Sequence, residues 1–198
     1  LTNNASPDLA PGVAVSKGGE KAIVAWRSVY AADAADLLNF SQQDHILYSI
    51  YSDNTGWSKP QMLYNGTSGP VKGITAAMLS DGSAAIAYTL DTGRKGEPLD
   101  YEIGYTIVGI DNQPALSAII TQDQWLDENP QLVTVDFDSS NSVDERFVLG
   151  WHSVRGNVGD IRLAAFDNTG ALSNSFIESI AQAGGNGVKS GGSFRFAK

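Results

Sequence analysis

The chain has 198 residues, of which 42% are apolar and 18% are charged, and its net charge is −9. The acidic balance argues against binding to nucleic acid or to an anionic membrane surface, because such binding depends on Lys and Arg. The absence of cysteine excludes disulfides, thiolate catalysis and Cys-based zinc sites. No apolar run approaches the length of about 18 residues that a membrane-spanning helix needs, so we expect no membrane insertion.

Short apolar runs bounded by turn-forming residues follow one another along the chain, which is the pattern of β-strands. We expect four strands in each of three successive segments. The runs are Val13 to Ser16, Ala22 to Val29, His45 to Ser52 and Gln61 to Tyr64, then Ile74 to Leu79, Ala84 to Leu90, Tyr101 to Val108 and Leu116 to Thr121, and finally Leu132 to Phe137, Phe147 to Val154, Ile161 to Phe166 and Ser175 to Ile180.

Two sequence marks recur in these segments and define a repeat. The second run of each segment contains an aromatic residue, at Trp26, Tyr88 and Trp151, and these lie 62 and 63 residues apart. An Asp-Asn pair follows the third run of each segment. The pairs are Asp53-Asn54, Asp111-Asn112 and Asp167-Asn168. Self-similarity at a period of about 40 to 60 residues indicates a repeat architecture.

The joins between runs predict hairpins. Asp81-Gly82 joins the first two runs of the second segment, and Asp-Gly accepts the positive φ of a tight turn. The turns that begin at Asp53 and Asp167 suit a type I turn closed by a left-handed glycine. The second segment has Pro114 at that place, and because proline cannot take a positive φ, its turn must differ.

Four antiparallel strands per repeat are typical of a β-propeller blade. The segment Ser52-Asp53-Asn54-Thr55-Gly56-Trp57, between a third and a fourth strand, resembles the Asp box of bacterial extracellular propellers of the sialidase-like kind. It departs from the box in having serine and aspartate adjacent. The resemblance implies a structural turn remote from any active site, so it transfers no activity to this chain.

We therefore expect an all-β chain with three four-stranded antiparallel blades of a β-propeller and part of a fourth. The expected blades are 10–66, 67–123 and 124–182, and a partial strand covers 193–198. Three blades do not close a ring, since closed propellers typically have at least about four. Three explanations stay open: the chain is part of a longer propeller, copies of it associate to complete the ring, or the units do not close.

The loops between second and third strands vary most in length, which marks a functional face. We expect a ligand site there. Its candidate residues are Asp44, Arg94, Asp100, Arg155 and Asp160, joined by Trp57, whose indole could stack on a sugar. The alternative is structural, because an aspartate at the mouth of a strand accepts turn N–H groups.

The segment from Asp136 to Glu145 alternates oxygen-bearing side chains, as a calcium loop does. Its candidate ligands are Asp136, Asp138, Ser140 and Asp144. It lacks the central glycine and the terminal glutamate of an EF-hand, and the alternative is a polar insertion in a hairpin. Apart from calcium, we expect no cofactor.

The favoured function is a non-catalytic binding or scaffolding module of a bacterial secreted, cell-surface or periplasmic protein, with a glycan or another protein as ligand. The main alternative is a glycoside hydrolase or lyase of sialidase-like architecture. Such enzymes use an arginine cluster, to which Arg27, Arg94 and Arg155 could contribute. A third alternative is a structural spacer. The sequence shows no convincing catalytic constellation, so the hypothesis leans away from an enzyme.

Overall fold

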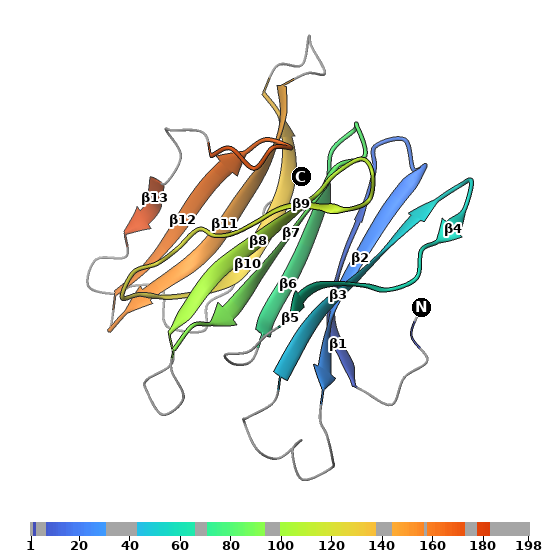
Figure 1. The fold of residues 1–198 in the computed structure, drawn as a ribbon. Coiled ribbons are helices and arrows are strands. Elements are labelled where there is room, and N and C mark those ends of the chain that lie inside the picture. The colour runs from blue at the N-terminus through green and yellow to red at the C-terminus, as the bar shows by residue number, and fades with distance from the viewer. Residues whose placement is uncertain are drawn as a thin grey trace.

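The computed structural model describes residues 2, 7–30, 43–65, 71–93, 100–137, 144–156, 158–172 and 178–182. The elements formed by these residues are β-strands, and they make three antiparallel sheets. Figure 1 shows the sheets side by side in chain order. Sheet 1 holds β1 (Asp8–Val15), β2 (Lys21–Tyr30), β3 (Gln43–Ser52), β4 (Gly56–Trp57) and β5 (Gln61–Asn65). Sheet 2 holds β6 (Val71–Met78), β7 (Ala84–Asp91), β8 (Tyr101–Val108) and β9 (Pro114–Ile119). Sheet 3 holds β10 (Leu126–Asp136), β11 (Glu145–Arg155), β12 (Val158–Phe166) and β13 (Glu178–Gln182).

The all-β, antiparallel prediction is confirmed, but the first strand of each sheet begins earlier than predicted. The pairing of these strands shifts between Leu9 and Gly12, between Lys72 and Thr75, and between Glu128 and Gln131. A residue with positive φ lies in each shift, namely Ala10, Gly73 and Asn129. Such β-bulges interrupt the alternation of side chains that identifies a strand in sequence. The predicted partial strand at 193–198 lies outside the described residues.

The turns follow the predicted chemistry. Gly56 and Gly170 take φ values of 70° and 78° after their Asp-Asn pairs. In sheet 2 the left-handed residue is Asn112, with φ of 66°, which leaves Pro114 free to begin β9. Asparagine tolerates this conformation better than most residues, so the turn keeps its position although the glycine is lost.

The sheets stack face against face, with one core cluster in each interface. We call the side of each sheet that carries Trp26, Tyr88 or Trp151 its aromatic face. The aromatic face of sheet 2 packs on the opposite face of sheet 1, around Ile23, Ile46 and Tyr88. In the same way, the aromatic face of sheet 3 packs on the opposite face of sheet 2, around Ile103, Phe147 and Trp151. First strands contact one another in both interfaces, β1 with β6 and β6 with β10.

The repeated aromatic residues are all buried. The indole nitrogen of Trp26 donates to Asp8 at 3.1 Å, and that of Trp151 donates to Asp127 at 3.0 Å. Tyr88 instead has its hydroxyl 3.4 Å from the Thr106 hydroxyl. Within the described part of the chain, no helix is long and apolar enough to cross a membrane.

Candidate functional site

The two ends of the stacked sheets separate the predicted ligand residues. At the loop end, second strands pass into third strands; the hairpin turns at the far ends of these strands form the turn end. Asp44, Asp100, Asp160 and Arg155 lie at the loop end. Trp57 follows the far end of β3, at the turn end, where it is 45% exposed and its ring centroid lies 5.5 Å from that of Tyr51. Arg94 lies outside the described residues.

Asp44 connects sheet 1 to sheet 2. Its side chain is fully buried, and its Oδ2 lies 2.8 Å from Nε of Arg27 and accepts a 2.8 Å hydrogen bond from the backbone N–H of Val71. Because Val71 begins β6, this carboxylate connects β3 of sheet 1 to the start of β6 in sheet 2. The contact supports the structural alternative for Asp44, since a buried carboxylate normally requires an ion-pair or hydrogen-bond partner.

The other loop-end residues have different surroundings. Asp100 accepts a 3.0 Å hydrogen bond from the Thr92 hydroxyl, and Arg155 is exposed and donates to Gln124. Asp160 is only 6% exposed and pairs across the sheet with Ser153. Of the arginines predicted for a cluster, Arg27 belongs to sheet 1 and Arg155 to sheet 3.

The strand register defines which third-strand residues are equivalent in the three sheets. In each sheet, the residue two positions after the repeated aromatic pairs with a residue on the third strand. That partner is His45 in sheet 1, Glu102 in sheet 2 and Asp160 in sheet 3. Thus Glu102, and not Asp100, corresponds to Asp160. Each of the three sheets therefore carries a titratable side chain at the same place near its loop end.

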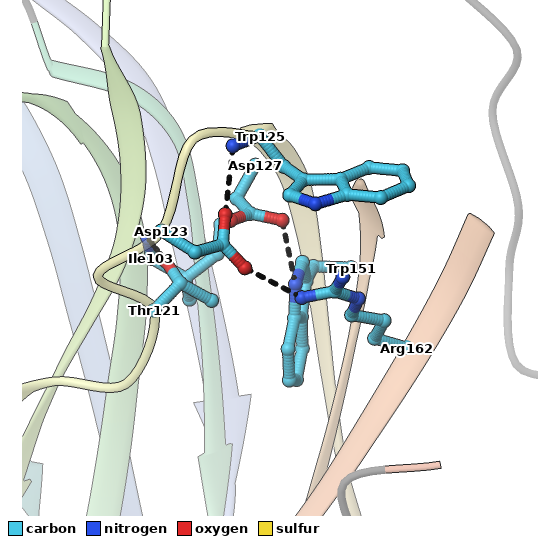
Figure 2. A network of polar contacts seen from close by, with 7 residues as sticks. All are labelled: Ile103, Thr121, Asp123, Trp125, Asp127, Trp151 and Arg162. Carbon is cyan, nitrogen blue, oxygen red and sulfur yellow. Dashed lines mark hydrogen bonds and ion pairs between the residues drawn. The ribbon is translucent and has the colours of Figure 1, made fainter. Parts of the chain in front are cut away.

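Polar contacts connect the segment between β9 and β10 to sheet 3 (Figure 2). Asp123 accepts a 2.7 Å hydrogen bond from the backbone N–H of Trp125 and forms a 2.8 Å ion pair with Arg162. The Arg162 guanidinium also lies 5.0 Å from the Trp125 ring centroid, within the range of a cation–π contact. These contacts fix the segment over the loop end of sheet 3, next to the Asp127–Trp151 hydrogen bond.

Two carboxyl groups of this region titrate near neutral pH. Burial raises the pKa of Glu102 to about 7, and the charge of Asp127 adds to the rise while the Thr121 hydroxyl opposes it. Burial also raises the pKa of Asp127 to about 6, although the Ser153 hydroxyl and the Trp151 indole stabilise its charged form. Such values suit proton transfer in either direction at physiological pH. Neither residue was predicted from the sequence. Their only signals are that Glu102 is an acidic residue within an otherwise apolar run and that Asp127 lies beside a bulge.

Of the predicted calcium ligands, Asp136 and Asp144 lie at the turn end. Asp138 and Ser140 are outside the described residues, and Asp136 ends β10. Asp144 forms a 2.7 Å ion pair with Arg146, which occupies one of its carboxylate oxygens. Across the residues that the structure describes, no group of three or more His, Cys, Asp or Glu side chains is placed to hold a metal ion.

A cavity of about 550 Å³ lies at the turn end between sheets 2 and 3. The backbone N–H of Ser80 donates to Glu145 at 2.6 Å, and the Asn168 amide donates to Asp81 at 3.0 Å, so both sheets build its wall. The cavity is lined by Leu79, Ser80, Asp81, Asp144, Glu145, Arg146, Asp167, Asn168, Ala171 and Leu172. The ligand residues predicted from the sequence belong mainly to the opposite end, where the loops vary in length.

No protein-family model and no curated protein matches the chain significantly. Among solved structures, the chain is similar to a Hadza microbial sialidase, Hz136, with a TM-score of 0.50 and 10% identity over 89% of this chain. It is also similar to a protein of unknown function from Dyadobacter fermentans DSM 18053, with a TM-score of 0.54 and 12% identity over 86% of this chain. The chain spans 35% of the first protein and 55% of the second. At these identities the likeness concerns the fold alone, which is loosely sialidase-like.

Proposed function

We propose that the three sheets are consecutive blades of a β-propeller, with borders near 10–66, 67–123 and 124–182. The support is that each interface buries the aromatic face of one sheet against the opposite face of the preceding sheet. First strands that contact one another at both interfaces are the arrangement expected around a propeller axis. The likeness in fold to a microbial sialidase agrees with this proposal.

We further propose that the chain is a binding module of a bacterial secreted or cell-surface protein, and that it binds a glycan in the turn-end cavity. The cavity at the junction of sheets 2 and 3 carries the proposal, because it is large enough for a saccharide unit and combines polar groups with Leu79 and Leu172. Carboxylate and amide groups of its wall, such as those of Asp167 and Asn168, suit sugar hydroxyls, which both donate and accept hydrogen bonds.

The charge of the cavity restricts the class of glycan. Its lining contains four carboxylates and one guanidinium, that of Arg146, which leaves an excess of negative charge. The carboxylate of Asp144 already neutralises Arg146, so little positive charge remains for an anionic ligand. A neutral or amine-bearing sugar is therefore favoured over a sialylated or uronic one, whose carboxylate would be repelled.

A glycan array followed by calorimetry tests this proposal. We expect binding to neutral or amino sugars and not to sialosides, and we expect Asn168→Ala to weaken it about tenfold through loss of one polar contact. Asn54→Ala is the matched control, since Asn54 holds the same place in the repeat but lies in the exposed turn of sheet 1, away from the cavity. Equal loss in both variants, or no glycan binding by the unmodified chain, would contradict the proposal.

The second candidate function is a glycoside hydrolase, and the pKa values of Glu102 and Asp127 are the observation that favours it. A general acid with a pKa near 7 is what glycosidic cleavage requires, together with a second carboxylate. Hydrolysis of fluorogenic glycosides, sialosides included, would be measured for the unmodified chain and for Glu102→Gln. Activity that the variant loses at unchanged KM would establish this function; activity that survives in the variant would exclude Glu102 as the acid.

A further inference from the structure

The segment between β9 and β10 connects sheet 2 to sheet 3 at the loop end (Figure 2). It is anchored to sheet 2, because the backbone N–H of Ile120 donates to the Ile103 carbonyl at 2.8 Å and the Thr121 hydroxyl accepts from the backbone N–H of Ile103 at 2.8 Å. Within the described part of the chain, residues 122–125 make no backbone–backbone hydrogen bond to sheet 3. We call these four residues the strap.

Side chains hold the strap to sheet 3, and Arg162 makes the main contacts. Its Nη1 lies 2.8 Å from Oδ2 of Asp123, and its guanidinium lies 5.0 Å from the Trp125 ring centroid. Arg155 adds a hydrogen bond to Gln124 that is long, at 3.4 Å. The side chains of Asp123 and Arg162 are 36% and 19% exposed, and an ion pair accessible to water stabilises a fold only weakly. The strap can therefore separate from sheet 3 without unfolding a strand.

A buried carboxyl group lies at each end of the strap. Glu102 is 3% exposed, and its carboxyl interacts with the Thr121 hydroxyl. Asp127 is fully buried, and strand pairing aligns it with Ser153 and Asp160 on the aromatic face of sheet 3. Ionisation of either carboxyl is disfavoured as long as it stays buried.

Negative charges dominate the surroundings of these two carboxyl groups. Burial raises the pKa of Glu102, and the charges of Asp127, Asp100 and Asp123 raise it further. Burial also raises the pKa of Asp127, whereas the charge of Arg162 lowers it. The other charged side chains near this level of the neighbouring strands are Arg27, Asp44, Lys72, Asp91, Arg155 and Asp160. Arg162 thus interacts both with Asp123 in the strap and with Asp127 beneath it.

We propose that the strap is a pH-controlled gate at the loop end between sheets 2 and 3, with the Asp123–Arg162 ion pair as its clasp. At about pH 5 Glu102 and Asp127 are neutral in the folded chain, so Arg162 pairs with Asp123 and the strap is closed. Above neutral pH both acids ionise, and three carboxylates then compete for one guanidinium. Their repulsion releases Asp123, and the water that enters favours the charged forms of Glu102 and Asp127.

The gate does not depend on glycan binding in the turn-end cavity, which lies at the opposite end of the sheets. For the second candidate function it has a direct consequence, because a substrate can reach the carboxyl of Glu102, 3% exposed in the closed form, only when the strap opens. The gate is tested by fluorescence, so its failure is distinguishable from a failure to bind or to cleave a glycan.

Acrylamide quenching of Trp125 fluorescence tests the gate. It is measured in the full chain carrying Trp57→Phe, because Trp57 is 45% exposed whereas Trp26 and Trp151 are buried. We expect the quenching constant to rise about twofold between about pH 5 and about pH 8, as the half-buried indole of Trp125 separates from Arg162. A quenching constant that is the same at both pH values would overturn the proposal.

Substitutions in the same background separate the clasp from its trigger. Arg162→Gln should leave Trp125 open to acrylamide already at about pH 5, with folding checked by circular dichroism. Glu102→Gln combined with Asp127→Asn should keep the strap closed at about pH 8, because neither side chain can ionise. Arg155→Ala is the matched control and should keep the pH profile, because Arg155 contacts the strap only through Gln124.

Two results with these variants would also overturn the gate. One is a Trp125 that stays protected in folded Arg162→Gln, and the other is a Trp125 that opens with rising pH in the Glu102→Gln, Asp127→Asn variant as it does in the parent chain. The second result decides whether or not Arg162→Gln folds.

Discussion

Glu102 makes the stability of the fold depend on pH in a direction opposite to that of most carboxylates. Its folded-state pKa is raised from 4.5 to about 7, so folding favours its protonated form. This contribution is fully present below the unfolded-state pKa and is lost as the pH rises through about 7. Since the shift is about 2.5 units and each unit corresponds to about 1.4 kcal/mol, the loss is on the order of 3 kcal/mol.

Urea unfolding between about pH 5 and about pH 8 measures this loss, and Glu102→Gln should remove it. Glutamine cannot ionise, so the variant should keep only the smaller decline that Asp127 contributes, because the pKa of Asp127 is raised to about 6. Asp167 does not interfere. Burial would raise its pKa, but hydrogen bonds from Thr169 and Ala171 outweigh burial and lower it, so its contribution is lost only in acid.

Glu20→Gln is the control, because Glu20 lies exposed in the β1–β2 turn. It should show the pH dependence of the unmodified chain. If the unmodified chain and Glu102→Gln lose the same free energy of unfolding between about pH 5 and about pH 8, the carboxyl of Glu102 is not the group that titrates, and the reasoning from its burial is refuted.

Four further substitutions test packing and polar contacts, each by the free energy of unfolding in urea. Trp151→Phe should lower the free energy of unfolding by about 1–3 kcal/mol, because it leaves the fully buried Asp127 without its indole donor. Trp26→Phe should lower it less, because Asp8 is half-buried and can be solvated. Asp44→Asn should cost about 1–3 kcal/mol through loss of charge-assisted contacts with Arg27 and Val71. Gly104→Ala should cost about 1–3 kcal/mol, because its new methyl group would lie 2.6 Å from the Tyr88 ring. Equal costs for the two tryptophan variants, or an unchanged stability for either of the other two, would contradict the respective contact.

The strands could be predicted because apolar runs and turn residues are local features. Tyr101 to Val108 was predicted with the bounds that the structure has. The first half of each first strand could not be predicted, because Pro11, Gly73 and Pro130 indicate loops when read alone. Only the pairing with the second strand shows that these residues continue a strand through a bulge.

The candidate site was harder to predict because it depends on register and on contacts between sheets. Asp100 and Asp160 each stand just before a predicted third run, whereas pairing aligns Glu102 with Asp160. A shift of two residues keeps each side chain on the same face but changes which side chains share a level in the sheet. The hydrogen bond from Val71 to Asp44 and the cavity next to Asn168 likewise arise where two sheets meet, which no single segment encodes.

Where the three sheets differ at equivalent positions, the differences come in sets of residues that keep buried polar groups hydrogen-bonded. Sheets 1 and 3 each combine an aspartate on the first strand with a tryptophan and a serine on the second, as in Asp127, Trp151 and Ser153. Sheet 2 has Val71 where that aspartate would be. The repeated aromatic residue of sheet 2 is Tyr88, whose hydroxyl lies near Thr106 and therefore needs no aspartate as acceptor.

This correlated exchange follows from the cost of an unpaired donor on a covered sheet face, which is about 1–3 kcal/mol. An indole N–H without its aspartate would incur that cost, and so would a buried aspartate without its indole. Asp127 is therefore first of all the acceptor for Trp151. Any role in proton transfer must operate through its other oxygen, Oδ2, which is buried. Asp127→Asn separates the two roles, because asparagine keeps an acceptor for the indole but cannot ionise.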